Sequence, residues 1–220
     1  RATGINWTFA PTLAVPQDLR WGRSYEGYSQ DPKVVAQYAS AMIEGLQGKA
    51  GTPKFLDASH VIASAKHFLA DGGTKDGKDQ GDAQVSETEL REVHAAGYPP
   101  AIDAGVQTVM ASFSSWNGQK MHGNKALLTG VLKGRMDFQG FVVGDWNGHG
   151  QVPGCSNTDC PASINAGVDM LMAPDSWRGL YEHTLAEAKS GAIPAARLDD
   201  AVARILRVKF RLGLFEAGLP

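Results

Sequence analysis

The sequence has little of what marks several large classes of protein. Its net charge is −2 and its basic residues form no run, so it lacks the positive patch with which proteins bind nucleic-acid phosphates. It has no apolar run of about 18 residues, the length that a membrane-spanning helix needs. It also has no initiator methionine and no signal peptide, and it opens on RATGINWTFAP, which is typical of a protein interior. We therefore expect a fragment or processed chain that binds neither nucleic acid nor membrane.

Cysteine is scarce: the only two, Cys155 and Cys160, lie in the turn-rich stretch PGCSNTDCP. A metal site built on two thiolates needs further ligands, and no Cys or His follows at a zinc-like spacing. The pattern favours a local disulfide, which would indicate an oxidising compartment, so we expect a periplasmic or secreted protein. Two free thiols in a cytosolic loop are the alternative.

Apolar runs and helical patterns alternate along the chain. With 43% hydrophobic residues in 220 positions, the chain can bury one large core. The runs are continuous rather than alternating, which is typical of parallel strands covered on both faces by helices. We expect strands in 7–15, 60–70, 106–114, 140–146 and 169–174, and helices in 31–48, 86–105, 124–138, 161–168, 177–190 and 194–214.

Two α/β architectures fit this pattern, an open doubly wound sheet and a (β/α)8 TIM-type barrel. An open sheet usually carries a glycine-rich nucleotide loop after its first strand, and the sequence has neither GxGxxG nor GxxxxGK[ST]. Polar residues instead follow successive apolar runs, where a barrel keeps its chemistry. They are Lys66, His67, Ser112, Asp145, Trp146 and Asp175. A barrel has eight strands in about 250 residues, so we expect N-terminal strands to be missing ahead of Arg1.

Asp145 and Trp146 end the run GFVVGDW and suit sugar chemistry. An indole packs against the C–H face of a sugar while a carboxylate meets its anomeric carbon. The alternative is that Asp145 only caps the following turn. Lys66 and His67 can donate hydrogen bonds to hydroxyl groups, although a buried paired lysine and a core histidine would fit the sequence equally well.

Two polar segments remain open to interpretation. Asp18, Arg20, Arg23 and Glu26 are either a surface ion-pair network or a cluster in which the Arg23 fork binds vicinal hydroxyls. The glycine-rich loop 70–84 is either a solvated turn or a flap beside the site, because it directly follows Lys66 and His67.

Six motifs in order carry a family resemblance: DLRWGRSYEGYSQDP, SAKHFLADGGTKDG, TVMASFSSWNGQKMHGN, GFVVGDW, AGVDMLM and ARILRVKFRLGLFE. Together they resemble the N-terminal barrel domain of glycoside hydrolase family 3, and are most similar to its β-glucosidase and exo-β-glucanase branch. The resemblance runs from Arg1 to about Glu216. It implies a partial barrel domain in 1–216 and, in 217–220, the start of a linker to a second α/β domain.

The resemblance also implies roles for single residues. The aspartate of GDW is the family's nucleophile, here Asp145, and its tryptophan, here Trp146, lines the glucose subsite. The arginine that ends RWGR and the KH pair bind sugar hydroxyls, and the methionine of TVMAS makes an apolar contact. These residues are Arg23, Lys66, His67 and Met110. No metal or cofactor is implied.

The sequence departs from the family pattern in two places. Phe113 stands where many members carry a tyrosine whose hydroxyl bonds the nucleophile, so we expect that hydrogen bond to be absent. The run KHFLADGG replaces the KHFPGHG of N-acetylglucosaminidases, which disfavours their histidine acid. The catalytic acid/base of many members comes from the second domain, which we expect as an intramolecular partner.

The resemblance implies a retaining, exo-acting β-glucosidase or exo-β-glucanase. Its substrate would be the terminal β-D-glucosyl residue of a β-glucoside or β-glucan oligosaccharide, cleaved through a covalent glycosyl-aspartate. A β-xylosidase or another hexosidase on the same scaffold is one alternative. A non-catalytic carbohydrate-binding barrel is the other.

Overall fold

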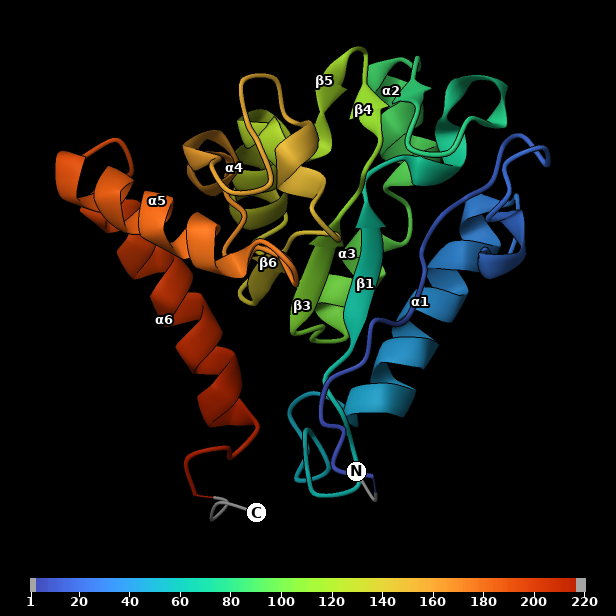
Figure 1. Cartoon of the computed structure of the whole chain (residues 1–220). Coiled ribbons are helices and arrows are strands. Elements are labelled where there is room, and N and C mark those ends of the chain that lie inside the picture. Colours follow the sequence, from blue (N-terminus) through green and yellow to red (C-terminus); the bar gives the residue numbers. More distant parts are fainter. Residues whose placement is uncertain (1–2, 217–220) are drawn as a thin grey trace.

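The centre of the molecule is a parallel three-stranded sheet, and the computed structural model describes residues 3–216 around it. The strands are β1 (Ser64–Phe68), β3 (Thr108–Ala111) and β6 (Phe141–Val143), in the order β1-β3-β6. Figure 1 shows them side by side, pointing toward the same end of the molecule. The linker expected in 217–220 lies outside the described residues.

Two further chain segments extend this sheet on its two sides. Trp7 and Thr12 form parallel bridges to Ile62 and Lys66 beside β1, and Met170 forms one to Val143 beside β6. The five apolar runs therefore lie next to one another in chain order, which confirms a parallel arc of a barrel. Their regular parts are shorter than predicted, because the apolar runs continue into buried loops.

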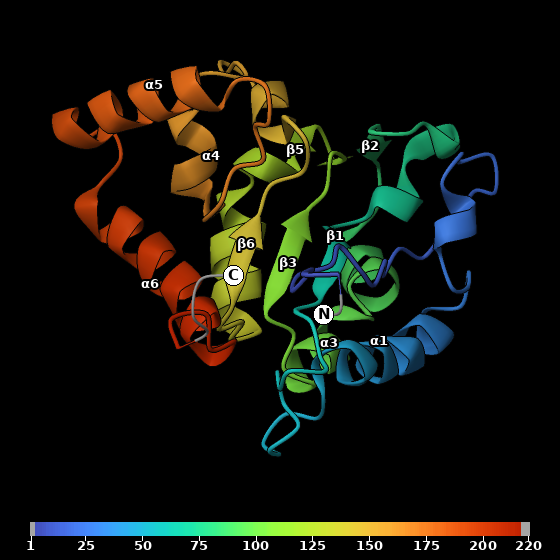
Figure 2. The ribbon, with the colours of Figure 1, turned by 60° about the horizontal axis from the view of Figure 1, so that its bottom comes forward.

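Helices follow the strands and cover the outer face of the arc (Figures 1 and 2). They are α1 (Pro32–Gln47), α2 (Glu87–Glu89), α3 (Tyr98–Asp103), α4 (Pro161–Ala166), α5 (Trp177–Ser190) and α6 (Ala195–Arg211), with π-helical segments η4 (Leu90–His94) and η6 (Ala126–Arg135). Short 3₁₀ turns are η1 (Ser24–Glu26), η2 (Asp71–Gly73), η3 (Lys75–Gly77), η5 (Met121–Gly123) and η7 (Gly148–Gln151).

Local chemistry sets the helix boundaries. Asp31 accepts a hydrogen bond from the Lys33 amide at the start of α1, and Gly48 ends that helix at φ 77°. Ser86 accepts from the Glu89 amide, as its capping pattern predicted. The single helix predicted for 86–105 is instead divided in two. A turn at residues 95–97 separates the continuous segment formed by α2 and η4 from α3.

Side chains alternate between the two faces of the sheet. Ala65, Val109 and Val142 face the helices in the larger hydrophobic cluster. Met110 and Val143 belong to a second cluster, on the inner face of the arc. On that inner face the Trp7 indole donates to Ser64 Oγ at 2.8 Å and to Thr108 Oγ1 at 3.1 Å, which satisfies buried polar atoms inside the barrel wall.

A small second sheet lies beyond the carboxyl ends of the main strands. It consists of β2 (Asp82–Ala83), β4 (Ser115–Trp116) and β5 (Gln119–Lys120), in the order β2-β4-β5. The β4–β5 hairpin turns at Asn117-Gly118, with φ 47° and 86°. Asn-Gly is a strong hairpin signal, so the dipeptide could have revealed this element from the sequence.

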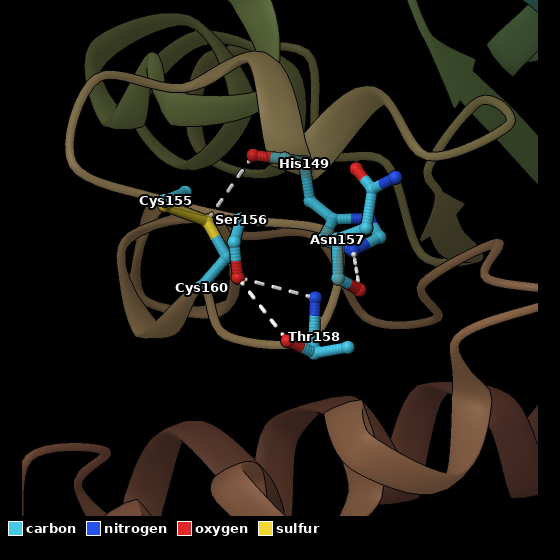
Figure 3. Close-up of a disulfide and its surroundings, with 6 residues drawn as sticks. All are labelled: His149, Cys155, Ser156, Asn157, Thr158 and Cys160. Carbon is cyan, nitrogen blue, oxygen red and sulfur yellow. Dashed lines mark hydrogen bonds between the residues drawn. A yellow bond between two sulfur atoms is a disulfide. The ribbon is translucent and has the colours of Figure 1, made fainter.

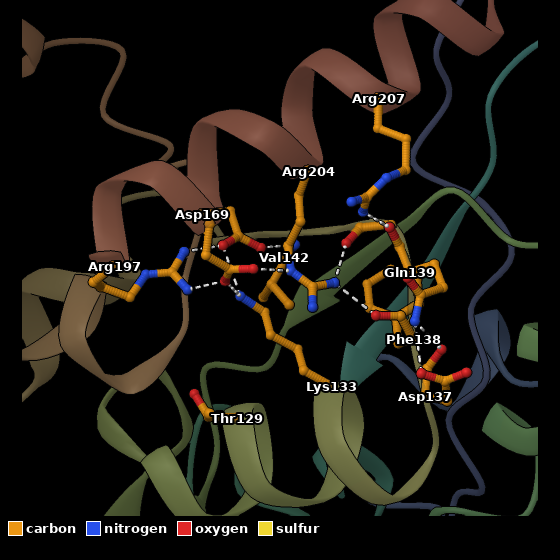
Figure 4. A network of polar contacts seen from close by, with 12 residues as sticks. Thr129, Lys133, Asp137, Phe138, Gln139, Val142, Asp169, Arg197, Arg204 and Arg207 are labelled. Atoms are coloured by element: carbon orange, nitrogen blue, oxygen red, sulfur yellow. Dashed lines mark hydrogen bonds and ion pairs between the residues drawn. The ribbon is translucent and has the colours of Figure 1, made fainter. Parts of the chain in front are cut away.

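A buried ionic network fastens α6 to the outside of the sheet (Figure 4). The Asp169 carboxylate is fully buried and pairs with Lys133 at 2.7 Å and with Arg197, while its second oxygen accepts from the Val142 amide at 2.8 Å. Asp200 pairs with Arg197 and, at 2.8 Å, with Arg204. Burial lowers the pKa of the Lys133 ammonium group, whereas the paired carboxylates of Asp169 and Asp200 raise it.

Cys155 and Cys160 form the predicted disulfide, with Cα atoms 4.7 Å apart (Figure 3). The Cys160 sulfur lies 3.4 Å from the carbonyl oxygen of His149, and the ring of His149 bonds the carbonyl of Asn157 inside the same loop at 2.9 Å. The disulfide thus braces the loop that follows Asp145. No helix in residues 3–216 is both long and apolar enough to cross a membrane.

Candidate active site

Three charged or polar side chains from distant parts of the chain meet at the carboxyl end of the sheet. Asp145 follows β6 by two residues, and its Oδ2 lies 3.6 Å from His67 Nε2 on β1. Arg23 Nη2 lies 3.3 Å from the same imidazole nitrogen. The structure therefore brings together Arg23, His67 and Asp145, at the end of the strands where the sequence placed them.

Asp71 decides which ring nitrogen of His67 carries the proton. Its Oδ2 is 2.8 Å from Nδ1 of the buried imidazole, and a carboxylate only accepts, so Nδ1 donates. Arg23 only donates, so its contact requires a lone pair on Nε2. His67 therefore presents an acceptor toward Arg23 and Asp145. Asp71 was missed as a site residue, although its spacing of four from His67 was visible in the sequence.

The polar cluster after the first apolar run divides into two pairs. Arg20 and Asp18 form an exposed ion pair, as the surface interpretation predicted. Arg23 and Glu26 form a two-bond fork at 2.7 and 2.9 Å that is half-buried beside His67.

Arg23 and Glu26 each stabilise the charged form of the other. The hydrogen bonds to Glu26 raise the pKa of Arg23, against the effect of burial. The Arg23 hydrogen bonds lower the pKa of Glu26 against the effect of burial, and the nearby charge of Lys66 lowers it too. Lys66 is half-buried on β1, and its peptide bond to His67 is cis. Lys66 thus belongs to the same electrostatic environment as the fork.

Asp145 is held by one of its two oxygens. Its Oδ1 accepts from the Trp146 amide at 2.7 Å, and the side chain is 14% exposed. The Asp145 carbonyl accepts from the Gly148 amide at 2.9 Å, so Asp145 opens the turn that leads into η7, whose preceding residue Asn147 makes no side-chain cap bond. Within residues 3–216, Oδ2 accepts no hydrogen bond and faces His67 Nε2 at 3.6 Å.

The remaining predicted residues surround this centre at different depths. Met110 is buried and pairs in register with Val143, in the inner hydrophobic cluster below Asp145. The Trp146 side chain is 54% exposed, so an indole face is open to a ligand. The Phe113 ring lies 6.1 Å from that of His122, centroid to centroid, and offers no hydroxyl group. Residues 3–216 contain no group of three or more His, Cys, Asp and Glu side chains arranged to hold a metal ion.

The loop 70–84 lies beside the site and is held in place. The Lys120 ammonium donates to Gln80 O, Phe113 O and Gln151 Oε1 at 3.1, 2.9 and 2.8 Å. Gln151 Nε2 donates back to Gln80 Oε1 at 2.8 Å. One ammonium thus ties the loop to the β4–β5 hairpin and to η7.

Lys120→Met should loosen this loop while the barrel stays folded, because it removes all three donors and leaves their acceptors unpaired. Losing about 1.4 kcal/mol of local stability corresponds to about tenfold faster opening. Hydrogen–deuterium exchange should therefore speed up by about tenfold at the amides of residues 78–83. Lys125→Met, at an exposed lysine, is the matched control. If the amides of residues 78–83 exchanged at the same rate in the Lys120 variant, the Lys120 ammonium would not be what holds the loop 70–84.

Comparison with known proteins gives several matches over nearly the whole chain. The crystal structure of an exo-1,3/1,4-β-glucanase (ExoP) from a Pseudoalteromonas species is 53% identical with a TM-score of 0.96, and the match covers 97% of this chain and 27% of that one. A β-xylosidase of Formosa agariphila is 35% identical over 99% of this chain and 31% of the relative. The periplasmic β-glucosidase of Salmonella typhimurium is 33% identical over 96% and 28%.

The chain therefore spans about a third or less of the length of these relatives. The family described as "Glycosyl hydrolase family 3 N terminal domain" matches residues 1–208. That match and the parallel barrel arc agree with the resemblance carried by the motifs, and the chain belongs to glycoside hydrolase family 3, within whose N-terminal domain it forms a partial α/β barrel.

Proposed function

We propose that the protein is a retaining, exo-acting β-glucosidase or exo-β-glucanase with Asp145 as its nucleophile. The observation that carries the proposal is the Asp145 carboxylate itself, which is anchored through Oδ1 and turns Oδ2 toward His67 Nε2 at 3.6 Å. A carboxylate with one fixed oxygen is oriented for attack, because the bond to the Trp146 amide limits its rotation.

In this mechanism Oδ2 of Asp145 attacks the anomeric carbon as the aglycone leaves, and water later hydrolyses the glycosyl-aspartate. The leaving oxygen takes its proton from a second carboxyl about 5 to 5.5 Å from the nucleophile. We assign that acid/base to a second α/β domain of the same protein. The share of the relatives that this chain leaves uncovered has ample room for such a domain.

The sugar hydroxyls would be bound opposite the nucleophile. Arg23 and Lys66 are donors whose charge is balanced by Glu26, and His67 Nε2 would accept from a sugar hydroxyl in place of Arg23. Trp146 would stack on the sugar ring with its exposed indole, and Met110 would supply an apolar contact from the inner face.

A glucosyl residue is the proposed substrate because the solved relative that is 53% identical is named an exo-1,3/1,4-β-glucanase. A β-xyloside is the second candidate, since the Formosa relative is named a β-xylosidase. The disulfide and the periplasmic Salmonella relative support export to the periplasm or the cell exterior.

Covalent trapping tests the proposal in the full-length protein. A 2-deoxy-2-fluoro-β-glucosyl donor with a good leaving group should add one fluoroglucosyl unit, and peptide mass spectrometry should locate it on Asp145. The 2-fluoroxylosyl analogue, run in parallel, should react more slowly. Faster labelling by the xylosyl donor would favour the β-xylosidase. No label from either donor, with the sugar still bound, would indicate a carbohydrate-binding barrel.

A further inference from the structure

The imidazole of His122, in the turn η5, is hydrogen-bonded at the ends of two barrel strands. Its Nε2 accepts from the main-chain amide of Asp145 at 2.9 Å. The same ring also hydrogen-bonds the backbone of Ser112, directly after β3. The imidazole thus bridges the carboxyl ends of β3 and β6, where Asp145 emerges.

The His122 ring is neutral in this position. It is 1% exposed, and burial is the main cause that lowers its pKa to about 3, followed by the neighbouring His149. The hydrogen bond to the Ser112 backbone raises the pKa of His122, and the Lys120 charge lowers it. The Asp145 amide only donates, so its bond requires a lone pair on Nε2, which leaves the single proton of the neutral ring on Nδ1.

Two glycines around the nucleophile turn make room for this ring. A Cβ on Gly148 would lie 2.4 Å from His122 Cε1, a distance that no real side chain tolerates. A Cβ on Gly144 would lie 3.4 Å from Cδ2. The turn from Gly144 to Gly148 therefore wraps the imidazole closely, so a movement of the ring would move the turn.

We propose that His122 is a positioning residue that fixes the main chain of Asp145, and through it the carboxylate, for attack on the anomeric carbon. This inference rests on the proposed function of Asp145 as nucleophile. His122 acts through the amide of Asp145 rather than on the sugar. Its loss should therefore slow covalent attack more than it weakens binding.

His149 provides a matched comparison, because it is equally buried and lies beside His122. Its ring bonds the carbonyl of Asn157 in the disulfide loop instead of the nucleophile (Figure 3). A merely structural role for buried histidines predicts that substitutions at the two positions have similar consequences. A positioning role predicts a specific loss at His122.

The test measures fluoroglucosyl trapping in the full-length protein, with its saturating rate and its half-saturation concentration. His122→Met should lower the saturating rate by about 100-fold and leave the half-saturation concentration within about threefold, because a misplacement of about 1 Å costs that much in rate. His122→Gln should recover most of the rate, since its Oε1 can replace Nε2 as acceptor. His149→Met should lower the melting temperature and leave the trapping rate near wild type.

The outcomes separate this inference from the proposed function. Wild-type trapping at Asp145 together with an equal rate in His122→Met would overturn the positioning role alone. If the methionine variant does not fold, His122→Asn replaces it, because its shorter amide cannot reach the Asp145 N–H. Equal rates in the Gln and Asn variants would then overturn the inference. A wild-type protein that is not labelled at Asp145 would overturn both.

Discussion

Asp145→Asn in the full-length protein should lower kcat on an activated β-glucoside by about four to six orders of magnitude and leave the fold intact. The amide is nearly isosteric with the carboxylate, and its oxygen can still accept from the Trp146 amide. What it lacks is the negative charge that attacks the anomeric carbon. Steady-state kinetics and the melting temperature, measured on the same preparation, check both parts of this result.

Azide should partly rescue the smaller variant Asp145→Gly. The anion fits the space of the missing carboxylate, attacks from the same face of the sugar, and releases an α-glycosyl azide, which NMR identifies. A variant that turned over at nearly the wild-type rate but melted several degrees lower would show that Asp145 is structural. The loss of a turn cap, which costs about 1 kcal/mol of stability and little activity, would have that signature.

Asp169→Ala should cause the largest loss of stability. The substitution leaves Lys133 and Arg197 buried without their shared carboxylate, and it also removes the acceptor of the Val142 amide. Removing one partner of a buried ion pair typically costs about 3 to 5 kcal/mol. In a domain of this size that corresponds to a melting temperature lower by about 6 to 20 °C. Differential scanning calorimetry measures it directly.

Asp200→Ala is the matched control, because it removes the other carboxylate of the same network. Asp200 is 40% exposed, so water can replace it as the partner of Arg197 and Arg204. Its loss should cost about 1 kcal/mol or less. Equal melting temperatures for the Asp169 and Asp200 variants would contradict the assignment of the network's stability to the buried carboxylate.

Local structure was largely predictable from the sequence. The cap residues Asp31 and Ser86, the end of α1 at Gly48 and the disulfide all depend on residues within about five positions of one another. Such contacts depend little on the tertiary structure, because the short stretch of chain between the partners keeps them close together. The hairpin at Asn117 belongs to the same class and was overlooked.

The sequence also determined the order of the barrel. Continuous apolar runs separated by helical patterns leave few ways to bury both faces of a strand, so the five parallel segments were correctly expected. The lengths of the strands were not, since an apolar run shows that a segment is buried but not where its hydrogen-bonded ladder stops.

Only the tertiary structure decided the contacts within the site. Arg23 and His67 are 44 positions apart, and the bond between Asp145 and His122 joins residues 23 positions apart. Whether such groups meet depends on how helices pack and how strands align, which no local pattern encodes. The motifs indicated which side chains could serve a glycosidase. The fold decided that Arg23 and Asp145 both meet His67 and that a neutral imidazole holds the backbone of Asp145, because long-range packing alone brings these groups within bonding distance.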